Sequence, residues 1–106
     1  MTINAKTKST TMRFLGARAG GPLTLGRLLE SIRLGEEETQ ASFARTLGIS
    51  RSHLCDIEHG RKNVSLERAV RFAEVLGYSR DQFVRLALQA MVEEAGLPLK
   101  VKIQAA

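Results

Sequence analysis

Apolar residues recur at helical spacing through most of the chain and predict a series of amphipathic helices. The first such run has intervals of three or four residues: Leu25, Leu28, Leu29 and Ile32. Thr24 precedes the run as a candidate N-cap, since its hydroxyl can accept a hydrogen bond from the first turn. Gly35 follows it. The pattern predicts a first helix over residues 25–34.

Residues 40–60 predict two short helices joined by a tight turn. The first would cover residues 40–47, the turn residues 48–50, and the second residues 51–59. Their apolar positions form one buried set: Phe43, Ala44, Leu47, Ile49, Leu54 and Ile57. Gly48 suits a sharp turn because glycine adopts a left-handed conformation without penalty. Ser50 is the expected cap of the second helix.

Two more helices are expected after a basic loop. Ser65 would cap a helix over residues 66–76, with these residues facing inward: Leu66, Ala69, Val70, Ala73 and Leu76. Ser79 and Gln82 have the spacing of a capping box for a last helix that runs to about residue 95. The architecture predicted is therefore all-α with five helices.

The last helix carries two apolar stripes, more than one core face requires. One stripe is Phe83, Ala87, Ala90, Met91 and Glu94, and the other is Val84, Leu88, Met91, Val92 and Ala95. The helix is either deeply buried or uses one stripe as a homodimer or partner interface. We favour the interface, because a small domain has little interior for two buried stripes.

The end of the chain alternates apolar and polar residues, which is the pattern of a short C-terminal β-strand. Its apolar positions are Leu99, Val101 and Ile103. Three interpretations stay open: the segment pairs with its copy in a dimer, adds to a partner's sheet, or is a disordered tail. We group its apolar residues with Val84, Leu88, Met91 and Val92 as a candidate dimer or partner interface.

Charge divides the chain into a basic leader and a nearly neutral body. Four of the 16 basic residues and none of the 11 acidic residues lie in residues 1–23. Such a leader is compatible with nucleic acid, with an acidic partner, or with a solvated flexible segment. We predict a flexible leader at 1–23, one domain at 24–95 and a tail at 96–106.

The remaining composition excludes several classes of site. Cys55 is the single cysteine, so an intrachain disulfide is excluded and a reducing cytoplasm is expected. The spacing of Cys and His predicts no metal site, and no cofactor is expected. The chain has no apolar run of transmembrane length and no signal-peptide pattern, so we expect no membrane partner. No arrangement of catalytic residues is apparent.

The residues from 40 to 60 resemble the phage repressor/Cro-type, or XRE-like, helix-turn-helix family. The matching positions are in register without insertion: Gln40, Ala44, Gly48, Ile49, Ser50, Leu54, Ile57, Glu58 and Gly60. Flanking residues extend the likeness from about residue 25 to residue 83. The resemblance implies a repressor-like DNA-binding domain with its helix-turn-helix at 40–59.

The resemblance also implies roles for individual residues. Base edges in the major groove would be read by residues that open the second helix and follow along its exposed face: Arg51, Ser52, His53 and Asp56. Arg51 is the strongest candidate, because its fork pairs with guanine O6 and N7, worth about 1–3 kcal/mol of discrimination. A phosphate contact is the alternative for Arg51. Phosphates would be held by Gln40, Ser50, Arg61, Lys62 and Asn63, although a solvated loop is the alternative for the last three.

Two further features concern acidic residues. The resemblance implies a structural ion pair between Arg33 and Glu58. Glu36 and Glu38 occupy loop positions at which the family usually has at least one apolar residue, so the acidic segment 36–38 would either repel phosphate or meet a basic partner.

Three functions compete. The first is a sequence-specific regulator, a repressor that binds double-stranded DNA as a homodimer on a near-palindromic operator. The second is a HigA-like antitoxin, which would control its own promoter and also neutralise a toxin nuclease. The third is an interaction module that does not bind DNA. An enzyme is the least expected class.

Overall fold

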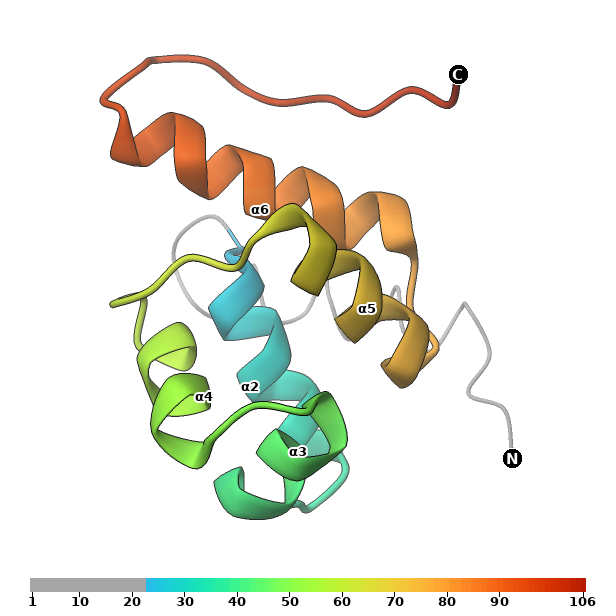
Figure 1. Cartoon of the computed structure of the whole chain (residues 1–106). Helices are drawn as coiled ribbons and strands as arrows, with labels where there is room; N and C mark the ends of the chain where they lie inside the picture. Colours follow the sequence, from blue (N-terminus) through green and yellow to red (C-terminus); the bar gives the residue numbers. More distant parts are fainter. Residues whose placement is uncertain (1–22) are drawn as a thin grey trace.

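The computed structural model describes residues 23–106, so the predicted leader lies outside the described residues except for Leu23. The described part is all-α, as predicted, and contains five helices and no strand (Figure 1). The helices are α2 (Leu25–Gly35), α3 (Gln40–Leu47), α4 (Arg51–Glu58), α5 (Leu66–Leu76) and α6 (Arg80–Glu94). None of these helices is long and apolar enough to cross a membrane.

Side-chain caps define where each helix begins. A Ser or Thr hydroxyl accepts from the backbone N–H three residues later at every start: Thr24, Thr39, Ser50, Ser65 and Ser79. Gly48 and Gly77 end α3 and α5 in the left-handed conformation. In α2, Gly35 is instead the last helical residue. The left-handed residue of this turn is Glu37 (φ 55°), two positions after the helix.

A single hydrophobic core lies between the helices, and Phe43, Phe72 and Phe83 are its largest fully buried side chains. Two details differ from the prediction. Leu66 is 39% exposed, because it lies in the first turn of α5 at the rim of the core, whereas Phe72 is completely buried. Leu86, which belongs to neither predicted stripe of α6, is buried as well.

Helices α2 and α4 approach each other closely at Gly26. A Cβ atom at this position would lie 2.1 Å from the carbonyl oxygen of Ile57, well inside van der Waals contact. Only glycine allows this approach, which brings the C-terminal end of α4 onto α2.

The segment after α6 forms no strand in the described chain, so the C-terminal β-strand is not found there. Residues 97–106 run back along α6 as an extended tail (Figure 1). A strand needs a backbone partner, and the described chain offers only the side chain of Gln89. That side chain binds the carbonyl oxygen of Leu99 (3.0 Å) and the N–H of Val101 (2.7 Å).

Candidate nucleic-acid interface

The turn between α3 and α4 presents the N-terminus of α4 to solvent. Gly48 (φ 75°) reverses the chain, and the N–H of Ile49 closes the turn onto the carbonyl of Ala44 at 3.0 Å. The Ser50 hydroxyl then accepts from the N–H of His53 at 3.0 Å. Arg51 and Ser52, the first residues of α4, are both exposed. A helix N-terminus with exposed side chains is suited to anions and to hydrogen-bond acceptors.

His53 lies next to these two residues but is only partly exposed. Burial, together with the positive charges of Arg68 and Lys62, lowers the pKa of His53 below its ordinary value. The imidazole is therefore mostly neutral near pH 7, when one ring nitrogen can donate and the other can accept.

Asp56 and Arg61 are bound to each other. The Nε atom of Arg61 lies 2.9 Å from Oδ1 of Asp56, and its Nη2 lies 3.5 Å from Sγ of Cys55. The hydrogen bond from Arg61 lowers the pKa of the Asp56 carboxyl. Asp56, a base-reading candidate, and Arg61, a phosphate-binding candidate, are thus paired with each other in the free chain. The sequence did not indicate this ion pair.

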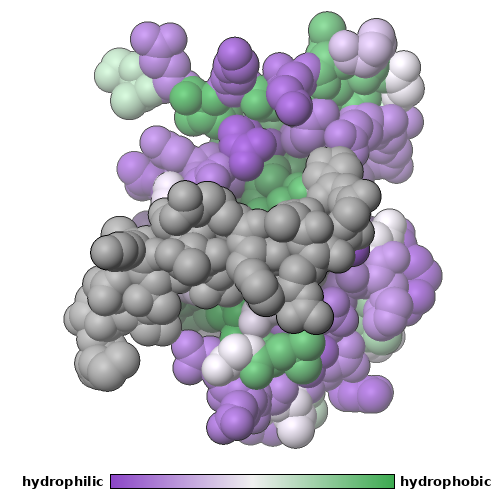
Figure 2. All heavy atoms as spheres, turned by 180° about the vertical axis from the view of Figure 1, so that it is seen from behind, coloured by the Kyte–Doolittle hydropathy of each residue, from purple (hydrophilic) through white to green (hydrophobic). Residues whose placement is uncertain are grey.

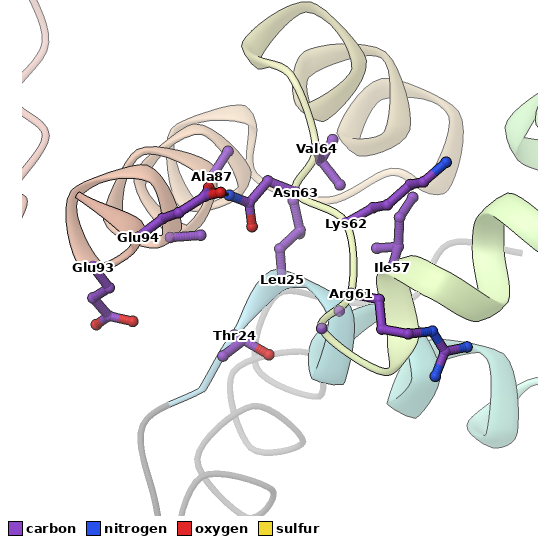
Figure 3. A pocket seen from close by; sticks show the side chains of 13 residues that line it. Thr24, Leu25, Ile57, Arg61, Lys62, Asn63, Val64, Ala87, Glu93 and Glu94 are labelled. Carbon is purple, nitrogen blue, oxygen red and sulfur yellow. Dashed lines mark hydrogen bonds between the residues drawn. The ribbon is translucent and has the colours of Figure 1, made fainter. Parts of the chain in front are cut away.

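The other two loop residues point in different directions. Lys62 is exposed and makes no ion pair within residues 23–106. Asn63 instead donates a hydrogen bond to the carboxylate of Glu94 on α6. Figure 3 shows Asn63 and Glu94 meeting across an open cleft, with Lys62 and Arg61 extending away from them. The structure therefore does not bring Asn63 together with the other phosphate-binding candidates.

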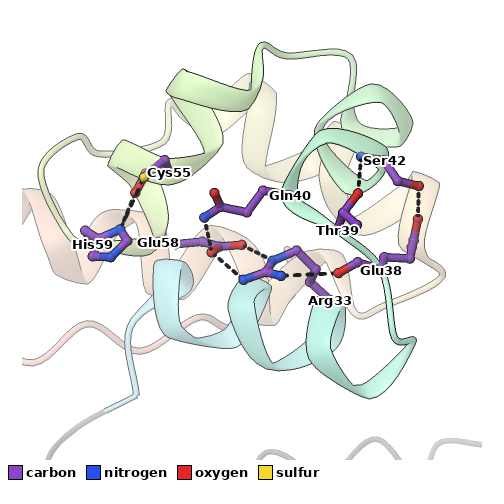
Figure 4. A network of polar contacts seen from close by, with 8 residues as sticks. All are labelled: Arg33, Glu38, Thr39, Gln40, Ser42, Cys55, Glu58 and His59. Atoms are coloured by element: carbon purple, nitrogen blue, oxygen red, sulfur yellow. Dashed lines mark hydrogen bonds and ion pairs between the residues drawn. The ribbon is translucent and has the colours of Figure 1, made fainter.

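A buried polar network joins α2, α3 and α4 (Figure 4). The Glu58 side chain is fully buried and accepts from Nε and Nη2 of Arg33, at 2.9 and 3.0 Å. Gln40 donates from Nε2 to the same carboxylate at 3.0 Å. Hydrogen bonding to Glu58 raises the pKa of Arg33, so the guanidinium remains charged. The network holds Gln40, at the start of α3, against the end of α4.

The bond from Gln40 to Glu58 was missed by sequence reasoning, which assigned Gln40 to a phosphate alone. The amide nitrogen has two hydrogens, and the bond to Glu58 uses one of them. The second remains for another acceptor.

The acidic loop between α2 and α3 is partly used for structure. Glu38 accepts from the Ser42 hydroxyl at 2.8 Å, and its carbonyl accepts from Nη1 of Arg33 at 3.2 Å. Glu36 acts on Tyr78, whose pKa is raised by burial and by this negative charge. Figure 4 places Glu38 on the opposite side of Gln40 from Cys55 and His59. The Glu38 carboxylate therefore lies away from the C-terminal part of α4, where Cys55 and His59 are.

The described residues contain no group of three or more His, Cys, Asp or Glu side chains that could hold a metal ion. The candidate site is therefore the exposed start of α4, with basic residues beside it. The buried network of Arg33, Gln40 and Glu58 holds this helix in place. Comparison of the sequence with protein families matches residues 29–83 to the helix-turn-helix model HTH_3.

The chain belongs to this helix-turn-helix family. The matched segment runs from α2 to the first turn of α6 and includes the network and both helices of the motif. Membership in this XRE/Cro-type family implies DNA binding and transcriptional regulation, and members are typically not enzymes. No significant match was found among curated proteins or among solved structures.

Proposed function

We propose that the protein is a transcriptional repressor that reads a specific operator with α4 in the major groove of DNA. The observation that carries this proposal is the buried Arg33–Glu58–Gln40 network, which holds the motif rigid while Arg51 and Ser52 stay exposed. A helix held in this way can enter the major groove, where each base pair has its own pattern of donors and acceptors.

In this proposal, the base edges are read from the exposed face of α4. Arg51 makes a bidentate contact with guanine, and Ser52 bonds a neighbouring base edge. His53 and Asp56 lie further along the same helix. Asp56 is held by Arg61, which fixes the carboxylate that would accept from the amino group of cytosine.

The phosphate contacts come from the two ends of the motif. Gln40 uses its second amide hydrogen, and Ser50 and Lys62 add contacts on either side of α4. Arg61 can bind a phosphate only if its ion pair with Asp56 breaks. Asn63 can do so only if its hydrogen bond to Glu94 breaks. These contacts contribute affinity that falls with salt, and Lys62 is the strongest candidate among the loop residues.

We further propose that the repressor is a homodimer. The support is the outer stripe of α6, where Val84, Leu88 and Val92 are partly exposed and Met91 is 36% exposed. A dimer of this kind would bind two half-sites about 34–36 Å apart. Leu99, Val101 and Ile103 lie in the tail that runs back along α6, and they remain candidates for a dimer or partner contact.

Operator binding and footprinting test this proposal. DNA selected from a random pool should bind far more tightly than scrambled DNA of the same composition, and the protected region should span both half-sites. Sedimentation should give a dimer that Leu88→Glu converts to a monomer, while Val75→Glu, on the exposed surface of α5, leaves it intact. Equal affinity for selected and scrambled DNA would rule out sequence-specific repression.

An antitoxin is the second candidate, favoured by the exposed apolar residues Leu97 and Leu99 after α6. Such a protein would bind its own promoter and also cover a toxin nuclease. Co-expression with a small neighbouring reading frame tests it. Growth that is arrested by the neighbour and rescued by this chain would support the antitoxin, whereas a harmless neighbour would favour the repressor alone.

A further inference from the structure

Among the described residues, one side chain, that of Gln89, binds the backbone of the C-terminal tail along one edge. Gln89 donates from Nε2 to the carbonyl of Leu99, and its Oε1 accepts from the N–H of Val101. A neighbouring β-strand pairs with the same groups, the carbonyl of one residue and the N–H two residues later. Nε2 also donates to Glu93 at 3.1 Å, which orients the amide. Gln89 thus takes the place of a strand at the edge that faces α6.

The opposite edge of the tail makes no hydrogen bond to the part of the chain that the structure describes. Successive peptide groups of an extended chain point to opposite sides, so the N–H and C=O groups of Lys100 and Lys102 point away from Gln89. Within residues 23–106, the backbone of neither lysine makes a hydrogen bond. An extended segment with one free edge is a template for another strand.

The side chains around this edge define what a partner strand would meet. Leu99 is 59% and Ile103 37% exposed, and both lysines are exposed. Figure 2 shows apolar and polar residues alternating along the tail at the upper edge of the molecule. Residues 95–106 contain no acidic residue, and neither lysine makes an ion pair within residues 23–106. Opposite charges directly across two strands stabilise the pairing, and like charges oppose it.

In the antiparallel register that pairs Leu99 with Ile103 and Val101 with its own copy, a second copy of the chain is a poor fit for this edge. Antiparallel pairing centred on Val101 keeps the apolar residues on one face, but it sets Lys100 of each chain opposite Lys102 of the other. A strand with acidic residues at the matching positions removes this repulsion and adds two favourable pairs.

We propose that the free edge at Lys100 and Lys102 receives an extended segment of another protein, with Asp or Glu at alternate positions and apolar residues between them. The backbone groups of the lysines supply the hydrogen bonds, and their ammonium groups select the acidic strand. The site is separate from the DNA-binding motif, and the proposal stands independently of repression.

Peptide binding to the full chain tests the proposal. The probe is a labelled peptide with the core Val-Glu-Val-Glu-Val, and its control replaces each Glu by Lys. Fluorescence anisotropy should show about tenfold tighter binding of the acidic peptide, from two charge pairs. Amide exchange measured by NMR should slow at Lys100 and Lys102 when the acidic peptide binds.

Variants separate this site from general attraction between opposite charges. Lys100→Glu with Lys102→Glu should reverse the preference, so that the basic peptide binds more tightly. Arg71→Glu with Arg80→Glu makes the same change of charge at exposed positions elsewhere and should leave the preference as it is. Equal binding of the two peptides, or unchanged exchange at both lysines, would overturn the proposal. So would slow amide exchange at Lys100 and Lys102 in the free chain, because a second copy would then occupy the edge.

Discussion

Replacing Glu58 by Ala removes the centre of the network that joins α2, α3 and α4. The lost carboxylate accepts from Arg33 at 2.9 and 3.0 Å and from Gln40 at 3.0 Å. The Arg33 side chain is only 12% exposed, so its charge would lose its partner without regaining much water. Removal of one member of a buried ion pair typically costs 3–5 kcal/mol.

We expect a loss of about 3 kcal/mol in the free energy of unfolding, at the low end of that range because the Arg33 side chain is not completely buried. A small domain has about 5–15 kcal/mol in total, so the effect is large. Replacing both members, Arg33→Met with Glu58→Leu, should cost less than Glu58→Ala alone, because no charge is then left unpaired.

Urea denaturation followed by far-UV circular dichroism measures these differences. Asp56→Ala serves as the matched control, because it breaks a solvent-exposed ion pair, the one between Asp56 and Arg61. Its unfolding midpoint should stay close to that of the wild type. Equal unfolding midpoints for Glu58→Ala and Asp56→Ala, or a double variant of Arg33 and Glu58 that is less stable than Glu58→Ala, would refute the structural role of the buried ion pair.

Three other predictions follow from the structure. Gly26→Ala sets a Cβ atom 2.1 Å from the carbonyl oxygen of Ile57 and should cost about 3 kcal/mol or more in a urea titration, whereas Gly35→Ala, which meets nothing within 4 Å, should not destabilise the chain. Because the folded chain holds the pKa of His53 below its ordinary value, the unfolded chain takes up this proton first. Unfolding free energy should therefore fall as the pH drops below about 6.5, and His53→Gln should reduce that fall. Lys62→Ala should weaken binding to all DNA sequences alike and reduce the salt slope of the binding constant by about 1.

The helices were predictable because their signals are local. Each Ser or Thr cap and each apolar repeat lies within a few residues of the element that it defines, so short-range rules suffice. Gly26 was not predicted to matter, because its requirement for glycine depends on how closely α2 and α4 approach each other. That approach, at the carbonyl oxygen of Ile57, is visible only in the structure.

The polar contacts of the site were less predictable because they join residues far apart in the chain or in different elements. Asn63 binds Glu94, 31 positions away, and Gln40 binds Glu58, 18 positions away. Which carboxylate lies within reach depends on how the helices cross, and local spacing does not contain that information. The alternation in the tail predicts a strand, but a strand forms only with a backbone partner, and the Gln89 side chain supplies just one amide group.

Selection of bound DNA from a random pool, with the wild-type chain and with Arg51→Ala, tests most directly whether α4 reads bases. The wild type should enrich a motif in which one position of each half-site is guanine. Arg51→Ala should lose the preference at that position, by about 1–3 kcal/mol, and keep the others. Enrichment of the same motif by both proteins, or of none by the wild type, would contradict the account.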